Sequence, residues 1–307
     1  MTRHHQVPEE LSRVPFRGSG AVESGLLTKN QLRGPTFVRL FPDVYVRRGL
    51  DADADTRVAA LRMRTGGEGV ACGLTAAWLH GVWRPARGTA LPLEFVLSMR
   101  RLGRCAPSEV VRKRGLLVTS AERTCFDLMR RHRLVEAVVV ADAFAAADAL
   151  ALPSLAQFCA ERRRWPEVRL ARLATSLANA GARSPGETRL RMIVVLAGYD
   201  EPLVNVPVHG ERGEHLGTPD LIMTGPRWVH LEYDGAYHDE EGQHGRDLRR
   251  QNALHGYGGV PLLRFDWRHV LRQRLDVLRD LTRVSGRSPR QQLDDRDFER
   301  GARVGRW

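Results

Sequence analysis

The segment 228–238, WVHLEYDGAYH, places two carboxylates inside a run of β-branched and aromatic residues that predicts a strand. Residues two apart in a strand point to one side and lie about 6.5–7 Å apart, so Glu232 and Asp234 share a face. Asp220 belongs to the preceding segment, and antiparallel pairing through the turn TGPR would bring it close to Glu232. Close carboxylates repel one another unless a cation compensates their charge, and oxygen ligands of this kind suit Mg²⁺ or Mn²⁺. The pattern therefore predicts a metal site made by Asp220, Glu232 and Asp234.

Two further residues could take part in chemistry at this site. Glu187 precedes the predicted sheet and would be a fourth carboxylate, but Ser184 and Glu187 also fit the capping box S-x-x-E at the start of a helix. His238 follows the Asp-Gly turn, and a histidine near neutral pKa can act as a base. The alternatives stay open: a helix cap for Glu187, an ordinary loop histidine at 238, and a solvent-facing strand that carries Glu232 and Asp234.

A basic helix, GQHGRDLRRQNALHGYG, is expected to flank the same site. Asp247 and Arg250 lie three apart on one face of it, where they can bridge to each other or support the site and its phosphate. The predicted phosphate-binding or DNA-binding residues are Arg246, Arg249, Arg250 and Arg264.

The elements that position these residues follow the order αβββαβα. A helix begins at SPGETRLRMIVVLAG, with Ser184 as N-cap and Gly198 at its end. Three strands follow in PLVNVPVHG, GTPDLIM and RWVHLEYDG. The basic helix, a strand in VPLLRFDW and a last helix in RHVLRQRLDVLRDLTRV complete the order. The sequence therefore predicts an α/β fold for this part of the chain.

The first part of the chain predicts a different module. FVRLFPDVYVRRG alternates apolar residues around a Pro-Asp turn, which is typical of a β-hairpin, and GLLTKNQL before it is helical with Thr28 as a candidate N-cap. Helices followed by a hairpin with basic flanks describe a winged helix-turn-helix. The alternative is a small α+β unit that only packs on its neighbour. The predicted regions are 1–85 (winged-helix-like), 86–180 (α/β), 181–285 (the site domain) and 286–307 (a polar, arginine-rich tail).

Composition favours a polyanionic partner. The 307 residues carry a formal net charge of +12, and only Lys29 and Lys113 are lysines, the other basic residues being arginines. DNA is the expected partner, although an arginine-rich genome would give the same bias. The four cysteines lack metal-ligand spacing and predict reduced thiols. The most apolar run, LVEAVVVADAFAAADALAL, contains three acids and predicts a buried helix, and no signal peptide is recognised, so we expect a cytoplasmic protein without a membrane span.

The motifs PDLIM, HLEYDGAYH, DLRRQNAL and VPLLRFDW together resemble the PD-(D/E)XK nuclease superfamily, in particular its very-short-patch-repair-like group. The resemblance covers residues 184–281, about a third of the chain. It implies a restriction-endonuclease-like core, which is a mixed sheet flanked by helices with a metal site at one strand end. By motif, Asp220 is the first metal-binding acid and Glu232 the second.

The sequence departs from this superfamily at one position. Asp234 stands where the superfamily usually has its catalytic lysine, and this region contains no lysine. The role of that lysine would fall to His238, Arg250 or Arg264. A histidine after the Asp-Gly turn is usual in the similar group, which favours His238.

The first part of the chain resembles the winged-helix halves of abortive-infection antitoxins, on GLLTKNQL, LFPDVYVRRG and GLLVTSAERTCFDLMR. Three hypotheses follow. The first is a Mg²⁺- or Mn²⁺-dependent DNA endonuclease of repair or defence. The second is a DNA-binding regulator or antitoxin-like protein with a degenerate nuclease core, and the third is an interaction scaffold. A homodimer is left open, and no toxin partner is visible in the sequence.

Overall fold

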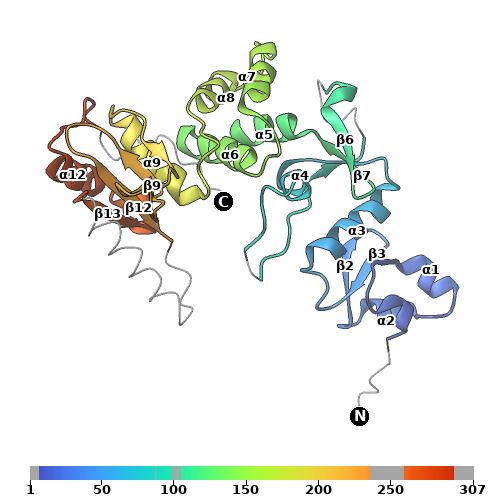
Figure 1. Cartoon of the computed structure of the whole chain (residues 1–307). Coiled ribbons are helices and arrows are strands. Elements are labelled where there is room, and N and C mark those ends of the chain that lie inside the picture. The colour runs from blue at the N-terminus through green and yellow to red at the C-terminus, as the bar shows by residue number, and fades with distance from the viewer. Residues whose placement is uncertain (1–6, 87, 99–101, 103–104, 236–258, 294–307) are drawn as a thin grey trace. The chain divides into compact units, whose positions relative to one another are not determined.

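The computed structural model describes residues 7–86, 88–98, 102, 105–235 and 259–293 (Figure 1). The chain folds into two compact units, Met1–Asp127 and Leu128–Trp307. Each unit contains a mixed sheet accompanied by helices, so the predicted α/β class is confirmed. Five of the predicted site residues lie outside the described residues: His238, Arg246, Asp247, Arg249 and Arg250.

The first unit begins with a three-stranded sheet in the order β1-β3-β2. Its elements are, in chain order, η1 (Glu9–Leu11), β1 (Phe16–Arg17), α1 (Gly18–Glu23), α2 (Lys29–Arg33), β2 (Phe37–Phe41) and β3 (Val44–Arg47). The predicted hairpin is confirmed as β2 and β3, and Thr28 caps α2 in a capping box with Gln31. A small apolar core holds the helices on the sheet, and in it the rings of Phe16 and Phe37 meet edge to face at 5.3 Å.

A second, four-stranded sheet completes the first unit in the order β5-β4-β7-β6, with β4 parallel to β7 and the other pairs antiparallel. Its elements are α3 (Ala54–Thr65), β4 (Val70–Ala71), α4 (Gly73–Leu79), β5 (Phe95–Val96), η3 (Pro107–Glu109), β6 (Val110–Lys113), β7 (Leu116–Thr119) and α5 (Ala121–Met129). Arg123 of α5 is buried. It pairs with Glu109 of η3 at 2.6 Å, which joins α5 to the segment before β6, and with Asp127 of its own helix at 2.7 Å.

The second unit is built around a four-stranded sheet in the order β13-β12-β11-β8, in which β12 and β13 are parallel and the other pairs antiparallel. Its helices are α6 (Leu134–Ala146), α7 (Leu152–Glu161), α8 (Val168–Ser176), α9 (Pro185–Leu196), α11 (Trp267–Arg272) and α12 (Arg274–Ser285). Its strands are β8 (Leu203–Val204), β9 (Val208–His209), β10 (His215–Gly217), β11 (Leu221–Met223), β12 (Val229–Asp234) and β13 (Leu262–Asp266). Residues of α9, α11 and α12 share one apolar core with alternate residues of the sheet.

Buried ion pairs join α6 to α9 inside the second unit. Arg191 and Asp142 are each 1% exposed and pair at 3.0 Å, and Arg189 makes a two-pronged contact with Glu136 at 2.7 Å. The helices before residue 181 pack with the sheet that follows it, and both belong to the unit Leu128–Trp307.

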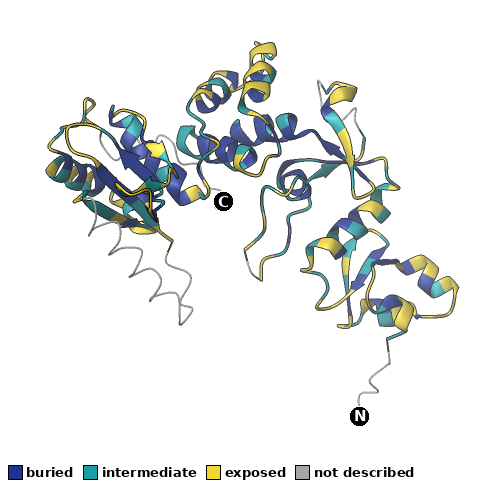
Figure 2. Cartoon of the chain, in the orientation of Figure 1, coloured by how far each residue is buried: buried dark blue, intermediate teal, exposed yellow. Residues whose placement is uncertain are grey.

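Helix α6 has the buried, alanine-rich character that the sequence predicts. Figure 2 shows its dark blue, buried positions, and the run Ala137–Ala141 lies almost entirely inside the unit. The core covers this helix on several sides, which explains why its pattern is apolar all round. No helix in the described ranges is long and apolar enough to cross a membrane.

Two predicted elements of the second unit are interrupted. PLVNVPVHG forms two short strands, β8 and β9, because Asn205 between them has φ of 51°, a left-handed conformation that ends extended structure. The last predicted helix is divided into α11 and α12 at Gln273, whose φ of −124° and ψ of 41° lie outside the helical region. Both interruptions are local backbone events that hydrophobic periodicity does not reveal.

Candidate functional site

The sheet of the second unit brings Asp220 and Glu232 together. Leu221 lies opposite Leu231, and Ile222 opposite His230, so the next position of this register places Asp220 opposite Glu232. Leu221 and Leu231 face the apolar core, whereas Glu232 belongs to the alternate set on the other face of the strand. The two acids thus meet where β11 begins and β12 approaches its carboxyl end.

Asp220 has a structural role at this point. Strand β11 begins at Leu221, so the backbone N–H of Tyr233 on β12 has no partner in the ladder. The Asp220 carboxylate accepts this N–H through Oδ2 at 2.8 Å. An orphaned backbone donor would cost about 1–3 kcal/mol, so the contact stabilises the sheet where its strands separate.

Glu232 forms an ion pair with Arg264, its register neighbour on the parallel strand β13. The Nη2 atom of Arg264 lies 2.7 Å from Oε2 of Glu232, and their side chains are 38% and 14% exposed. The guanidinium therefore compensates the charge of this carboxylate. The sequence predicts a phosphate-binding role for Arg264. In the structure, its described partner is Glu232, the predicted second metal-binding acid.

Glu187 is buried at the start of α9, where its carboxylate is held by backbone and side-chain donors. Its Oε2 accepts the N–H of Arg183 at 2.9 Å and the Nδ2 amide of Asn205 at 2.8 Å. The Ser184 cap is confirmed, because its hydroxyl accepts the N–H of Glu187 at 3.2 Å. Asn205 also donates its backbone N–H to the carbonyl of Asp220, and so connects Glu187 to the acids of the sheet.

Asp234 lies at the exposed end of β12, opposite Asp266 of β13. Asp266 caps α11, and its Oδ1 accepts the N–H groups of Arg268 and His269 and contacts His269 Nδ1 at 2.7 Å. Burial alone would raise the pKa of Asp266, but the hydrogen bonds from His269 and Arg268 outweigh it, and the pKa lies below its ordinary value. Asp266 is therefore held as a charged helix cap.

Two of the predicted metal-binding acids have protein partners in the structure. Across the described ranges, which exclude His238, no group of three or more His, Cys, Asp or Glu side chains is placed to hold a metal. Arg264 forms an ion pair with Glu232, and Asp220 accepts a hydrogen bond from the backbone N–H of Tyr233. A cation would have to replace the guanidinium.

Sequence reasoning missed Asn205 and the pairing of Glu232 with Arg264. The signal for Asn205 was weak, because an asparagine inside an apolar strand pattern indicates a break but not its partners. The ion pair depends on the register of two parallel strands that are separated by a long connection. Asp266 and His269, however, have the spacing of an N-cap and its N3 residue, which could have been recognised.

The first unit presents a separate basic surface on α2 and the hairpin β2–β3. Leu32 anchors α2 in the core, while Lys29, Asn30 and Arg33 on the same helix are exposed. Arg47 on β3 is exposed as well, and within the described ranges no acid pairs with Lys29, Arg33 or Arg47. These cations are available to a polyanion.

The turn of this hairpin is fastened to α1. Asp43 accepts the backbone N–H and the hydroxyl of Ser19, both at 2.7 Å, and these hydrogen bonds lower its pKa. The hairpin turn is therefore held against α1.

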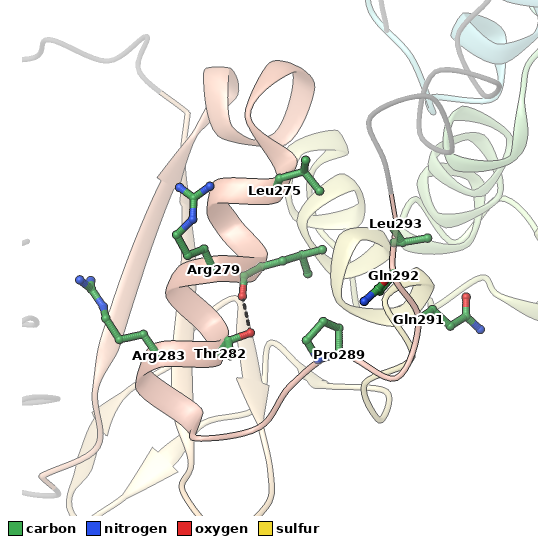
Figure 3. A pocket seen from close by; sticks show the side chains of 9 residues that line it. Leu275, Arg279, Thr282, Arg283, Pro289, Gln291, Gln292 and Leu293 are labelled. Atoms are coloured by element: carbon green, nitrogen blue, oxygen red, sulfur yellow. Dashed lines mark hydrogen bonds between the residues drawn. The ribbon is translucent and has the colours of Figure 1, made fainter.

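The second unit also contains a pocket beside α12 (Figure 3). It has a volume of 610 Å³ and lies between α12 and the chain that follows it. Its lining residues are Leu275, Leu278, Arg279, Thr282, Arg283, Pro289, Gln291, Gln292 and Leu293. None of the predicted catalytic or metal-binding residues is among them, so this pocket does not support the predicted chemistry.

Comparison with known proteins finds similar chains in Mycobacterium tuberculosis. The uncharacterized proteins MT2308 of strain CDC 1551 / Oshkosh and Rv2248 of strain ATCC 25618 / H37Rv are each 27% identical to this chain over 233 residues. The match covers 66% of this chain and 84% of each relative. No family model matches the sequence, and no solved structure matches it. Its function is therefore inferred from the geometry of its own residues.

Proposed function

We propose that this chain binds duplex DNA through its first unit and acts as a DNA-binding regulator or antitoxin-like protein. The observation that carries the proposal is the connectivity β1-α1-α2-β2-β3 with the sheet order β1-β3-β2. This order of elements supports a winged helix-turn-helix, whose second helix would enter the major groove and whose hairpin would contact the backbone.

The surface chemistry of α2 supports the same proposal. Lys29 and Arg33 lie four residues apart on one side of the helix, with Asn30 exposed between them. Unpaired cations bind phosphates, and an asparagine amide can make a two-pronged contact with adenine. The net charge of +12 adds a long-range attraction for DNA.

The experiment that tests this proposal is a mobility shift of the full chain on the DNA upstream of its own gene. A regulator forms a specific complex there, and EDTA leaves the complex unchanged because the contacts are made by side chains alone. Binding no tighter than to unrelated duplex would reject the regulator, since non-specific dissociation constants are about 10⁻⁴–10⁻⁶ M.

A metal-dependent endonuclease is the second candidate, and the meeting of Asp220 with Glu232 supports it. Glu187, linked to them through Asn205, would be a further acid of such a site. This candidate requires Arg264 to release Glu232, and it assigns the base to His238 outside the described residues. Cleavage of duplex, mismatched or single-stranded DNA that needs Mg²⁺ or Mn²⁺ and is lost in Glu232→Gln would support it. An inert wild-type protein on all three substrates would reject it.

A further inference from the structure

An exposed tryptophan with two arginines marks a second surface, in the second unit. Trp267 opens α11 directly after β13, and 36% of it is exposed. The guanidinium carbon of Arg268 lies 5.6 Å from the centre of its ring, and that of Arg272 lies 5.5 Å away. The three side chains therefore form a joint aromatic and cationic platform, which we name the Trp267 platform.

The two arginines of this platform differ in their partners from the arginines around them. The segment 261–293 contains eight arginines and three aspartates. Arg279 and Arg283 pair with acids of their own helix, and Arg264 pairs with Glu232. By contrast, no acid among the described residues pairs with Arg268 or Arg272, and both side chains are exposed. Within the described part of the chain, the two guanidinium groups of the Trp267 platform therefore have no acidic side chain as a partner.

We propose that the Trp267 platform binds an unpaired nucleic-acid strand. An unpaired base stacks on the exposed indole or on a guanidinium plane, and the adjacent phosphates pair with Arg268 and Arg272. A duplex cannot use the ring in this way, because the faces of its bases are already stacked. The ligand class is thus single-stranded DNA or RNA, or an unpaired base in distorted DNA.

Charge excludes the simplest competing occupant. A second copy of the chain could cover Trp267 together with Leu271, which is 42% exposed. A symmetric contact through this surface, however, would bring Arg268 and Arg272 against the same residues of the other copy. Like charges oppose such a contact, whereas a polyanion removes the repulsion.

This inference extends the proposed DNA binding to a second unit and a second ligand, so the two can fail separately. The test is fluorescence anisotropy of the full chain with an end-labelled oligothymidine of about 20 nucleotides and with a duplex of similar length. We expect Trp267→Ala to weaken oligothymidine binding about 5- to 160-fold. Its duplex affinity stays at the wild-type value, because the first unit carries duplex binding.

Matched variants distinguish a loss of binding from a folding defect. Trp267→Phe keeps an aromatic ring and retains most of the affinity. Arg268→Gln with Arg272→Gln changes only exposed side chains, weakens oligothymidine binding, and lowers the slope of log K against log salt by about 1.4. Trp228→Ala removes another exposed tryptophan, 49% exposed, that carries no described guanidinium on its ring, and it leaves binding unchanged.

Three results would overturn the inference. The first is a wild-type chain that binds the duplex but not oligothymidine. The second is a folded Trp267→Ala variant with wild-type affinity for oligothymidine. The third is a dimer in solution that Trp267→Ala dissociates while oligothymidine affinity stays constant, which would make this surface a self-association site. Loss of duplex binding in variants of α2, with oligothymidine binding intact, would instead bear only on the first unit.

Discussion

Arg264 and Glu232 are register neighbours on the parallel strands β13 and β12, and their side chains are joined by an ion pair of 2.7 Å. The position of Glu232 next to Asp220 resembles that of a metal-binding acid, yet its charge is compensated from inside the protein. A guanidinium and a divalent ion compete for the same carboxylate oxygens, since both bind them through positive charge.

Removal of Arg264 should therefore increase the affinity for a divalent ion. In Arg264→Gln, the neutral amide removes the guanidinium charge from Glu232 beside Asp220, and we expect Mn²⁺ to bind more tightly than to the wild type. Isothermal titration calorimetry and the Mn²⁺ spin-resonance signal measure the difference. The double variant Arg264→Gln with Glu232→Gln is the control and should return to weak binding. Mn²⁺ binding by the wild type as tight as in Arg264→Gln would show that the ion pair does not exclude the metal.

Breaking the buried pair between α6 and α9 should destabilise the second unit strongly. Arg191→Met leaves Asp142 buried without its cation, which costs about 3–5 kcal/mol. Arg279→Met is the exposed control, since its pair with Asp276 is largely in solvent, and it should cost about 0–1 kcal/mol. Urea unfolding measures both. Burial raises the pKa of Asp142, so the Arg191→Met variant should recover stability as the pH falls and this carboxyl gains a proton. Equal losses in the two variants would argue against the buried network.

Close packing at the start of α9 predicts that replacing Gly186 with alanine lowers the stability of the protein. A Cβ on Gly186 would overlap the ring of Tyr233, so Gly186→Ala should destabilise by about 1–3 kcal/mol. In α1, Gly20 has nothing within 4 Å, and Gly20→Ala should be neutral or stabilising by up to about 1 kcal/mol. Thermal unfolding compares them. Tyr233→Leu in the Gly186→Ala background should restore part of the loss, and additive losses would contradict this packing.

The first unit should lose stability in mild acid because of His80. Burial lowers the pKa of His80, and its Nε2 contacts the Thr119 carbonyl at 2.8 Å. A folded-state pKa below the unfolded value of 6.5 gives stability that is complete above pH 6.5 and declines as the pH falls through the folded pKa. Urea unfolding at pH values on either side of 6.5 detects this change. His80→Asn should flatten the dependence, and an unchanged slope would assign the effect to other groups.

Local signals predicted much of this fold. The Ser184 cap and Pro185 mark the start of α9, the Pro-Asp turn marks the hairpin β2–β3, and the alternation in VHLEYD marks β12. These features depend on neighbours within a few residues, which is the range over which propensity and capping act.

Contacts between distant segments could not be predicted in the same way. Asp142 on α6 and Arg191 on α9 are 49 residues apart in the sequence, and Arg264 reaches Glu232 only because β13 pairs parallel to β12. The short turn between the two strands predicts that Asp220 lies near Glu232. It does not predict which cationic side chain pairs with these carboxylates. The sequence therefore predicts which acids lie at the candidate site, but it does not predict the side chains that pair with them.

The central claim is that α2 carries duplex binding, and anisotropy of a labelled duplex with Lys29→Ala and Arg33→Ala combined tests it most directly. Two exposed cations that contact phosphate should, when removed, weaken binding at least tenfold and lower the slope of log K against log salt by about 1.8. Arg163→Ala with Arg169→Ala removes the same charge from exposed positions of the second unit and should retain most of the affinity. Equal affinity in the two double variants would contradict the claim, because duplex binding would then follow total charge and not the winged helix.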